Sequence, residues 1–385
     1  MIQLIFGSPG TGKTHHLVNE VIPSLTGTVC ILSYTKEAAK EIASRAKVRP
    51  SFCGTIHAFA FKAMRLSRSE VLADIGEWVK SLGGNPVNAE IISFHLKHRE
   101  MMVPCPSNPA YQAVIKSYKK YKEENFLYDF TDILEKGAQL PNIPEYDNII
   151  IDEGQDLTPL QWEMVLSIPH KNLIVAGDDD QAIFEWMGAD ALRMLQIHGK
   201  KTILSKSYRL PSPILNYSIE MIESQVIKRQ RKEVLPSDGE GKITRIPDVF
   251  HLIHTHKDPK KKITILVRDN YMKHDLTEYC YRNMIGTKNM FSGRRWRNFL
   301  DNRKISAGDK FFYKKTKEWT FDIRTIHSSK GLEWDNVCVV ATMAGKVLDS
   351  LYYQKTKEAE ARNWYVAITR AKKNLILAGT NEFIK

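Results

Sequence analysis

The stretch that decides the fold is Gly7-Ser8-Pro9-Gly10-Thr11-Gly12-Lys13-Thr14, which fits the pattern G-x-x-x-x-G-K-[ST]. Ile2 to Phe6 predicts a short strand before it, and His15 to Val21 predicts a helix after it. Strand, glycine-rich turn and helix in this order are the context of a P-loop, in which backbone N–H groups at a helix N-terminus hold phosphates. We therefore expect Lys13 to reach the β- and γ-phosphates of a nucleotide and the Thr14 hydroxyl to bind Mg²⁺.

Two further apolar runs end in acidic residues. Asn148 to Ile151 leads into Asp152-Glu153-Gly154-Gln155-Asp156, and Leu173 to Gly177 leads into Asp178-Asp179-Asp180-Gln181. Ligands bind at the carboxyl ends of parallel strands in α/β sheets. We therefore expect Asp152 to hold Mg²⁺, Glu153 to orient or deprotonate the attacking water, and Gln181 to sense the γ-phosphate. For either run alone, a strand that merely ends in an acidic turn is a fair alternative to a catalytic site. Downstream of a P-loop in the same chain, that alternative is poor.

The bulk composition limits the class of protein. The 385 residues carry a net charge of +12, which favours nucleic acid as a partner before membrane, although a basic solvated surface fits the charge almost as well. Five cysteines without a Cys-x-x-Cys pair indicate reduced thiols. A strand begins at Met1 without a signal sequence, and no apolar run reaches the roughly 18 residues that span a bilayer. We expect a cytoplasmic protein of a bacterium or phage, acting as a monomer without membrane contact.

Taken in order, these stretches resemble the motifs of superfamily 1 DNA helicases of the UvrD/Rep group. Residues 152–156 resemble that group's D-E-x-Q-D, and residues 177–189 resemble G-D-x-x-Q-S-I-Y-x-W-R-G-A. Similar matches cover most of the remaining chain: Tyr128–Leu134 with D-F-x-D-L-L, Leu204–Pro211 with L-x-x-N-Y-R-S, Ile265–Asn270 with I-L-x-R-x-N, Thr325–Trp334 with T-x-H-x-S-K-G-L-E-F, and Tyr365–Ala371 with Y-V-A-x-T-R-A. Each match is moderately specific alone, and the set in this order is very specific.

The resemblance implies an α/β fold with two RecA-like P-loop lobes on parallel sheets, ATP between the lobes, and a mostly helical insert in the first lobe. The implied boundaries are 1–60 and 126–200 for the first lobe, 61–125 for the helical insert, 201–292 and 320–385 for the second lobe, and 293–319 for a short basic insert. The chain would thus be a compact family member, with the second-lobe insert much reduced.

The helical insert contains one strongly patterned segment. Its apolar and aromatic residues recur at helical spacing and are interleaved with lysines: Tyr111, Ile115, Tyr118 and Tyr121 alternate with Lys116, Lys119, Lys120 and Lys122. This pattern predicts a packed aromatic face and a solvated lysine face, and the alternative is a face that contacts nucleic acid.

The resemblance also implies roles for individual residues. Arg209 would reach the γ-phosphate, Arg370 would act as the arginine finger, and Glu333 would contact the sugar of the nucleotide. For the two arginines, surface ion pairs are the alternative. Aromatic faces suit a grip on single strands of any sequence. Contacts to single-stranded DNA are implied for Tyr34, Thr35, Thr55, His57, Phe59, Phe184, Trp186 and His327.

The implied activity is that of an ATP- and Mg²⁺-dependent DNA helicase, which moves 3′ to 5′ on single-stranded DNA and unwinds tailed duplexes. The alternative from a different class is a translocase or ATP-gated clamp that displaces proteins without unwinding duplex. RNA as the track stays open. A P-loop small-molecule kinase fits neither the acidic box nor the two distal arginines.

The sequence departs from the family pattern in several places. It begins at the P-loop strand, without the preceding segment whose Gln reads adenine in the family, so we expect weaker discrimination between ATP and GTP. Met187, Ser207 and Trp334 replace the usual Arg, Asn and Phe. Residues 293–319 interleave basic and aromatic residues, which favours a nucleic-acid contact over a charged hairpin with packed aromatics.

Overall fold

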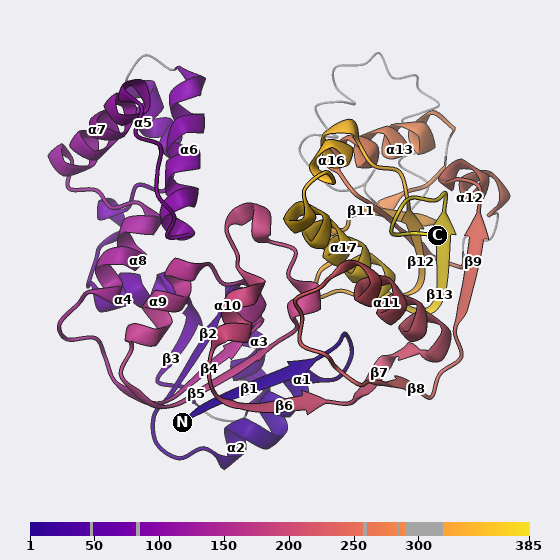
Figure 1. Cartoon of the computed structure of the whole chain (residues 1–385), viewed down its shortest axis with the longest axis horizontal. Coiled ribbons are helices and arrows are strands. Elements are labelled where there is room, and N and C mark those ends of the chain that lie inside the picture. The colour runs from indigo at the N-terminus through magenta and orange to yellow at the C-terminus, as the bar shows by residue number, and fades with distance from the viewer. Residues whose placement is uncertain (47–48, 82–84, 257–259, 284, 289–318) are drawn as a thin grey trace. The chain divides into compact units, whose positions relative to one another are not determined.

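The chain divides into two compact units (Figure 1). The computed structural model describes residues 1–46, 49–81, 85–256, 260–283, 285–288 and 319–385. The first unit comprises Met1–Gly7, Gly12–Leu204 and Gln230–Lys232, and the second comprises Ser8–Thr11, Ser205–Arg229 and Glu233–Lys385. The short basic insert expected at 293–319 lies outside the described residues, apart from Trp319.

The first unit is built on six parallel strands in the order β3-β2-β4-β5-β1-β6. The carboxyl ends of β4, β5 and β1 lie side by side, because β5 pairs with both neighbours in parallel. The P-loop and both acidic runs therefore begin at one edge of the sheet. The strands are β1 (Ile2–Gly7), β2 (Val29–Ser33), β3 (Phe52–Thr55), β4 (Tyr146–Asp152), β5 (His170–Gly177) and β6 (Lys200–Leu204).

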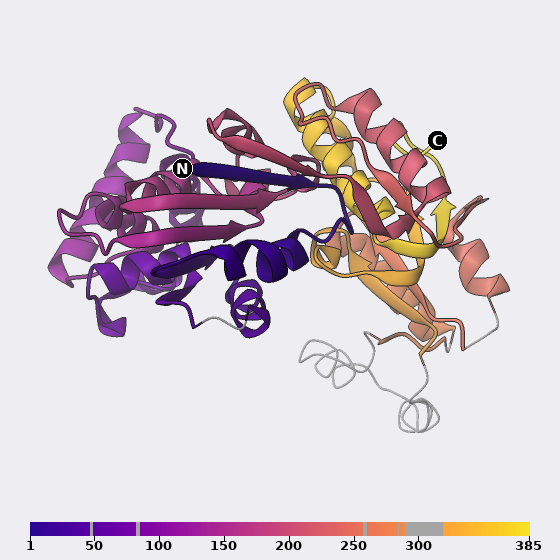
Figure 2. The same ribbon diagram turned by 90° about the horizontal axis from the view of Figure 1, so that it is seen from below.

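Helices cover both faces of this sheet, because successive strand residues point to opposite sides. Leu4 and Phe6 of β1 enter one apolar layer, while Ile5 enters the other. Figure 2 shows the indigo helices of residues 13–45 on the face of Ile5. This face carries α1 (Lys13–His16), a π-helical turn (Leu17–Val21), α2 (Ile22–Ser24) and α3 (Lys36–Arg45), and the other carries α4 (Ile56–Ala63), α8 (Phe130–Ala138), α9 (Pro159–Ser167) and α10 (Ala191–Gln196).

β3 stops at Thr55, because the Thr55 hydroxyl accepts the Ala58 N–H and caps α4. One expected boundary differs from the structure. The first unit extends to Leu204 instead of residue 200, because β6 pairs with β1 and completes the first sheet.

The insert expected at 61–125 is mostly helical, as predicted. It contains α5 (Ile75–Ser81), α6 (Pro86–Glu100) and α7 (Pro109–Glu124). Tyr111, Ile115 and Tyr118 are buried together with Trp78 in a separate core. Lys122 was expected on the solvated face but is 5% exposed, because Asp129 and Asp132 at the start of α8 pair with its ammonium group.

The second unit contains a five-stranded parallel sheet in the order β11-β10-β12-β13-β9 and a separate parallel pair, β7-β8. No helix among the described residues combines the length and apolar character needed to cross a membrane. The strands are β7 (Lys206–Pro211), β8 (Leu235–Ser237), β9 (Lys242–Ile246), β10 (Ile263–Val267), β11 (Phe321–Thr325), β12 (Trp334–Val340) and β13 (Ala371–Ala378), and the helices are α11 (Ser212–Gln225), α12 (Val249–Thr255), α13 (Asn270–Arg282), α16 (Gly345–Ser350) and α17 (Gln354–Ile368).

Candidate functional site

The candidate phosphate and metal ligands of the first unit meet at the carboxyl ends of β1 and β4. The Thr14 hydroxyl donates to Oδ2 of Asp152 at 2.8 Å, although 138 positions separate them. Lys13 is buried, and its ammonium group donates to the Gly7 carbonyl at 2.8 Å. The lysine thus lies curled against the P-loop backbone. A hydroxyl and a carboxylate in contact are hard oxygen ligands of the kind that Mg²⁺ prefers.

Glu153 lies directly beside this pair. The backbone turns sharply after β4, and Glu153 has φ 58° and ψ 42°, an uncommon conformation for a residue other than glycine. Its N–H donates to Oδ1 of Asp152 at 3.0 Å, and the Gln155 side chain donates to its carboxylate. The turn therefore fixes the side chain that we expect to act on water.

Gln181 is connected to this turn through Asp178. The Gln181 amide donates to Oδ2 of Asp178 at 2.7 Å, and the Asp178 N–H donates to the Gln155 side chain at 2.9 Å. Gly177 permits this approach, because a Cβ there would lie 2.5 Å from the Gln155 oxygen. Hydrogen bonds of the first unit thus connect Thr14 with Asp152 and Glu153, and Glu153 with Gln181 through Gln155 and Asp178, while Lys13 lies in the adjoining P-loop.

The surroundings of the Asp152 carboxyl shift its pKa. Burial and then the nearby Glu153 carboxylate raise its pKa from 3.8 to about 6, although the Thr14 hydroxyl and Lys13 act in the opposite direction. Ionising a carboxyl with a raised pKa costs native-state stability. Its contribution to the free energy of unfolding therefore falls as the pH rises from about 4 through 6.

We expect Mg²⁺ binding in the presence of ADP to weaken about tenfold between pH 7 and pH 5, because the metal must displace the Asp152 proton. Calorimetric titration in buffers of different ionisation enthalpy would measure both the affinity and the protons released. Glu153→Gln is the matched control, since removing the neighbouring charge should move the midpoint to lower pH. An unchanged midpoint in that variant would contradict the cause assigned to the pKa shift.

An aromatic pair lies among the residues expected to contact DNA. The rings of Tyr34 and Phe184 stack with centroids 5.4 Å apart and 16° between their planes. The Tyr34 hydroxyl donates to Sδ of Met187 at 3.5 Å. Met187 occupies the position where the family usually has Arg. Trp186 is 60% exposed nearby in sequence. An exposed aromatic face such as that of Trp186 can stack on bases.

Three other residues expected to contact DNA have structural roles in the first unit. The hydroxyls of Thr35 and Thr55 cap α3 and α4 by accepting N–H groups at 3.2 Å. Phe59 is 2% exposed and packs against Phe52 and Tyr146 in the core. Its ring is therefore not available to stack on a base, which corrects the expectation for this residue.

Glu100, at the end of α6, is a residue that the sequence analysis missed. Its carboxylate accepts the Thr158 hydroxyl at 2.7 Å and lies 4.0 Å from Nε2 of His57. Thr158 caps α9, just after the acidic box, so Glu100 connects the helical insert to that box and to His57. Burial raises the pKa of Glu100 and lowers that of His57 to about 4, so His57 is neutral at pH 7. No motif contains Glu100, and only the fold reveals its position.

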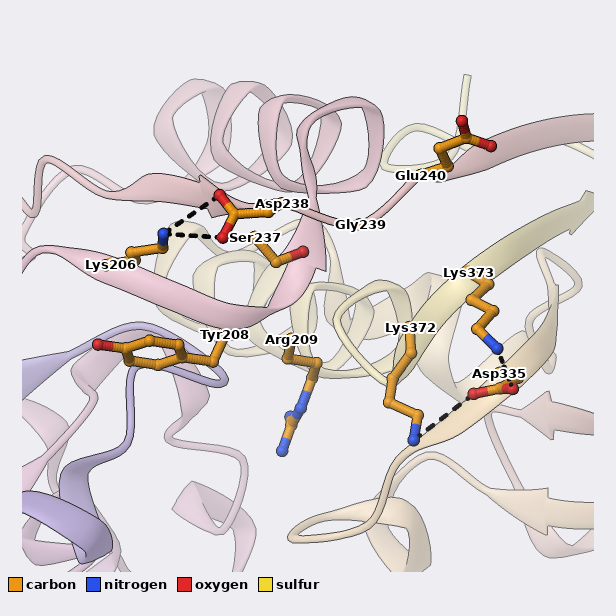
Figure 3. A pocket seen from close by; sticks show the side chains of 10 residues that line it. All are labelled: Lys206, Tyr208, Arg209, Ser237, Asp238, Gly239, Glu240, Asp335, Lys372 and Lys373. Atoms are coloured by element: carbon orange, nitrogen blue, oxygen red, sulfur yellow. Dashed lines mark hydrogen bonds and ion pairs between the residues drawn. The ribbon is translucent and has the colours of Figure 1, made fainter.

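In the second unit, Arg209 and Glu333 form an ion pair. Nε of Arg209 lies 2.6 Å from the Glu333 carboxylate, and Lys372 approaches the same carboxylate at 3.6 Å. Arg209 also lines a pocket of about 490 Å³ with Tyr208, a residue that is 73% exposed (Figure 3). The other lining residues are Lys206, Ser237, Asp238, Gly239, Glu240, Asp335, Lys372 and Lys373.

The tip of the P-loop belongs to this second unit. The Ser207 hydroxyl donates to the Pro9 carbonyl at 2.9 Å, and the Tyr208 N–H donates to the Gly10 carbonyl at 2.8 Å. Gly10 has φ 76°, and a Cβ there would lie 2.3 Å from Cβ of Arg209. Ser207, which replaces the family's Asn, thus holds the P-loop tip.

Arg370 and His327 are the remaining candidates in the second unit. Arg370 is 1% exposed, and its guanidinium donates to the carbonyls of Val366 at 3.0 Å and Leu332 at 3.2 Å. A surface ion pair is therefore excluded for Arg370. His327 begins a 3₁₀ turn, His327–Ser329, directly after β11.

Two family models match the chain. One described as an AAA domain matches residues 1–186, and one described as a UvrD-like helicase C-terminal domain matches residues 291–382. The ATP-dependent DNA helicase PcrA of Staphylococcus epidermidis is 24% identical over 376 residues, which cover 79% of this chain and 51% of that protein. DNA helicase II of Escherichia coli is 23% identical over 274 residues, 57% of this chain and 38% of that protein. The solved structure of arterivirus nonstructural protein 10, a helicase, is 13% identical to this chain, with a TM-score of 0.46. The match covers 99% of this chain and 60% of the arterivirus chain.

The chain is therefore similar to the UvrD-like helicases of superfamily 1. It spans about half the length of PcrA and 38% of the length of DNA helicase II.

Proposed function

We propose that this protein is a motor that hydrolyses ATP with Mg²⁺, moves 3′ to 5′ along single-stranded DNA and unwinds tailed duplexes. The observation that carries the proposal is the contact of Thr14 with Asp152, with Lys13 and Glu153 beside it, at the carboxyl edge of a parallel sheet. This arrangement supplies a phosphate-binding cation, two metal ligands and a base for water.

The second unit supports the same proposal. Arg209 offers a cation for a phosphate, and the exposed ring of Tyr208 beside it offers a stacking surface for a nucleotide base. Sequence reasoning missed Tyr208, although its place directly before Arg209 and within the motif was a usable signal. The stacked Tyr34–Phe184 pair and the exposed Trp186 are our candidates for the grip on bases.

The experiment that tests this proposal is ATP hydrolysis by the wild type and by Lys13→Ala, with and without single-stranded DNA. We expect DNA to stimulate the wild type strongly and the variant to lose about 10²-fold or more of kcat, because the developing phosphate charge loses its cation. Turnover that ignores nucleic acid would remove the motor from consideration. Tailed duplexes with 3′ or 5′ overhangs would then separate unwinding from translocation alone and give the polarity.

A further inference from the structure

The acidic run after β5 surrounds a buried lysine. Nζ of Lys232 lies 2.9 Å from Asp178, 2.6 Å from Asp179 and 2.9 Å from Asp180. Neither the lysine side chain nor those of Asp178 and Asp180 have exposed surface. A buried ammonium group with three carboxylates is costly to desolvate, so it persists only where its geometry is closely satisfied.

The lysine reaches this position from a distant segment. Residues 230–232 belong to the first unit, whereas the chain on both sides of them, Ser205–Arg229 and Glu233–Lys385, belongs to the second. The Gln230 N–H also donates to Oδ2 of Asp179 at 2.7 Å, so backbone and side chain together fix the segment to the run after β5.

One carboxylate connects this lysine to the candidate catalytic groups. Oδ1 of Asp178 faces Lys232 at 2.9 Å, and Oδ2 of the same carboxylate accepts the Gln181 amide at 2.7 Å. The Asp178 N–H donates to Gln155, whose amide donates to Glu153. The orientation of Asp178 therefore bears on both Gln181 and Glu153.

We propose that Lys232 is a positioning residue for ATP hydrolysis: it fixes the position of Asp178, whose carboxylate accepts the Gln181 amide and whose N–H donates to the Gln155 side chain that holds Glu153. The inference rests on the proposed function. The cluster holds three acids against one lysine, and burial raises the pKa of Asp179. A second variant in the cluster can therefore separate loss of charge balance from loss of position.

The first test compares Lys232→Met with Lys232→Met/Asp179→Asn. The single variant leaves three buried acids without their cation, so we expect a lower Tm. The double variant restores the net charge of the wild-type cluster and should recover most of the Tm. In both variants we expect the DNA-stimulated kcat to fall about tenfold or more with little change in the KM for ATP, because misplaced groups slow the chemical step. Lys228→Met changes an exposed lysine just before this segment in the sequence and should behave as the wild type.

A kcat that recovers together with the Tm in the double variant would overturn the proposal and leave Lys232 a purely structural residue. If neither Lys232 variant folds, Asp178→Asn supplies the answer, because it weakens the bridge to Gln181 while reducing the negative charge of the cluster. Its loss in kcat should exceed that of Asp180→Asn, which makes the same change of charge beside the same lysine; equal effects would overturn the proposal. A wild type without DNA stimulation would instead refute the proposed function, which the comparison of variants cannot do.

Discussion

Glu153→Gln is expected to bind nucleotide and single-stranded DNA like the wild type and to lose about 10²- to 10⁴-fold of its kcat. The amide keeps the size of the side chain but cannot accept a proton from the attacking water. The backbone turn at φ 58° does not depend on the charge, and the neighbouring Gln155 amide retains an oxygen to which it can donate. The measurement is steady-state hydrolysis together with fluorescence binding of a labelled nucleotide and a labelled single strand.

Glu163→Gln is the matched control, because Glu163 is an exposed acid on α9. It lies ten positions after Glu153 in the sequence and is not among the candidate site residues. It should leave both kcat and binding unchanged. Turnover of Glu153→Gln near the wild-type rate would disprove the assignment of Glu153 as the base. Loss of nucleotide binding would point to a metal-binding role for Glu153.

The parts of the site that could be predicted from sequence are local. The P-loop is a contiguous strand, turn and helix, and each acidic run directly follows its own apolar strand, so pattern alone places Lys13, Asp152 and Glu153 on the right elements. The parallel sheet then brings these strand ends to one edge, as open α/β sheets do. The strand order β3-β2-β4-β5-β1-β6 was not predictable, since it depends on pairings between distant segments.

The residues that sequence reasoning missed make long-range contacts. Glu100 meets Thr158 across 58 positions, and Lys232 meets Asp179 across 53. Lys122 was placed on a solvated face by its spacing alone, whereas two acids at the start of α8 made burial possible. Phe59 is the reverse case, an expected contact that is buried instead. Its place in a family motif predicts a contact with a base, but α4 directs its ring into the core. The periodicity of residue types along the sequence does not show which distant side chain pairs with a buried charge or packs against a buried ring.

Arg370→Lys is expected to lower kcat about 10³-fold or more with little change in the KM for ATP, as for loss of an arginine finger. Lysine keeps the charge but not the planar fork that can bridge two phosphate oxygens. The structure raises a direct alternative, because the Arg370 guanidinium donates to the Val366 and Leu332 carbonyls and is buried. In that alternative the arginine only holds the turn between α17 and β13, and its loss would act through stability.

Arg362→Lys separates the two accounts. Arg362 is also a buried arginine on α17, 3% exposed, and lies 4.0 Å from Glu358. Both variants should lower the Tm, because each replaces a buried guanidinium with a side chain that makes fewer hydrogen bonds. Only Arg370→Lys should reduce kcat in the folded protein, measured below the Tm of both variants. If kcat falls equally in the two variants, or in neither, Arg370 has no part in the chemistry. If kcat falls in Arg370→Lys alone, the guanidinium must exchange its carbonyl partners for the phosphate during turnover. The carbonyl oxygens and the phosphate oxygens compete for the same N–H groups of the guanidinium.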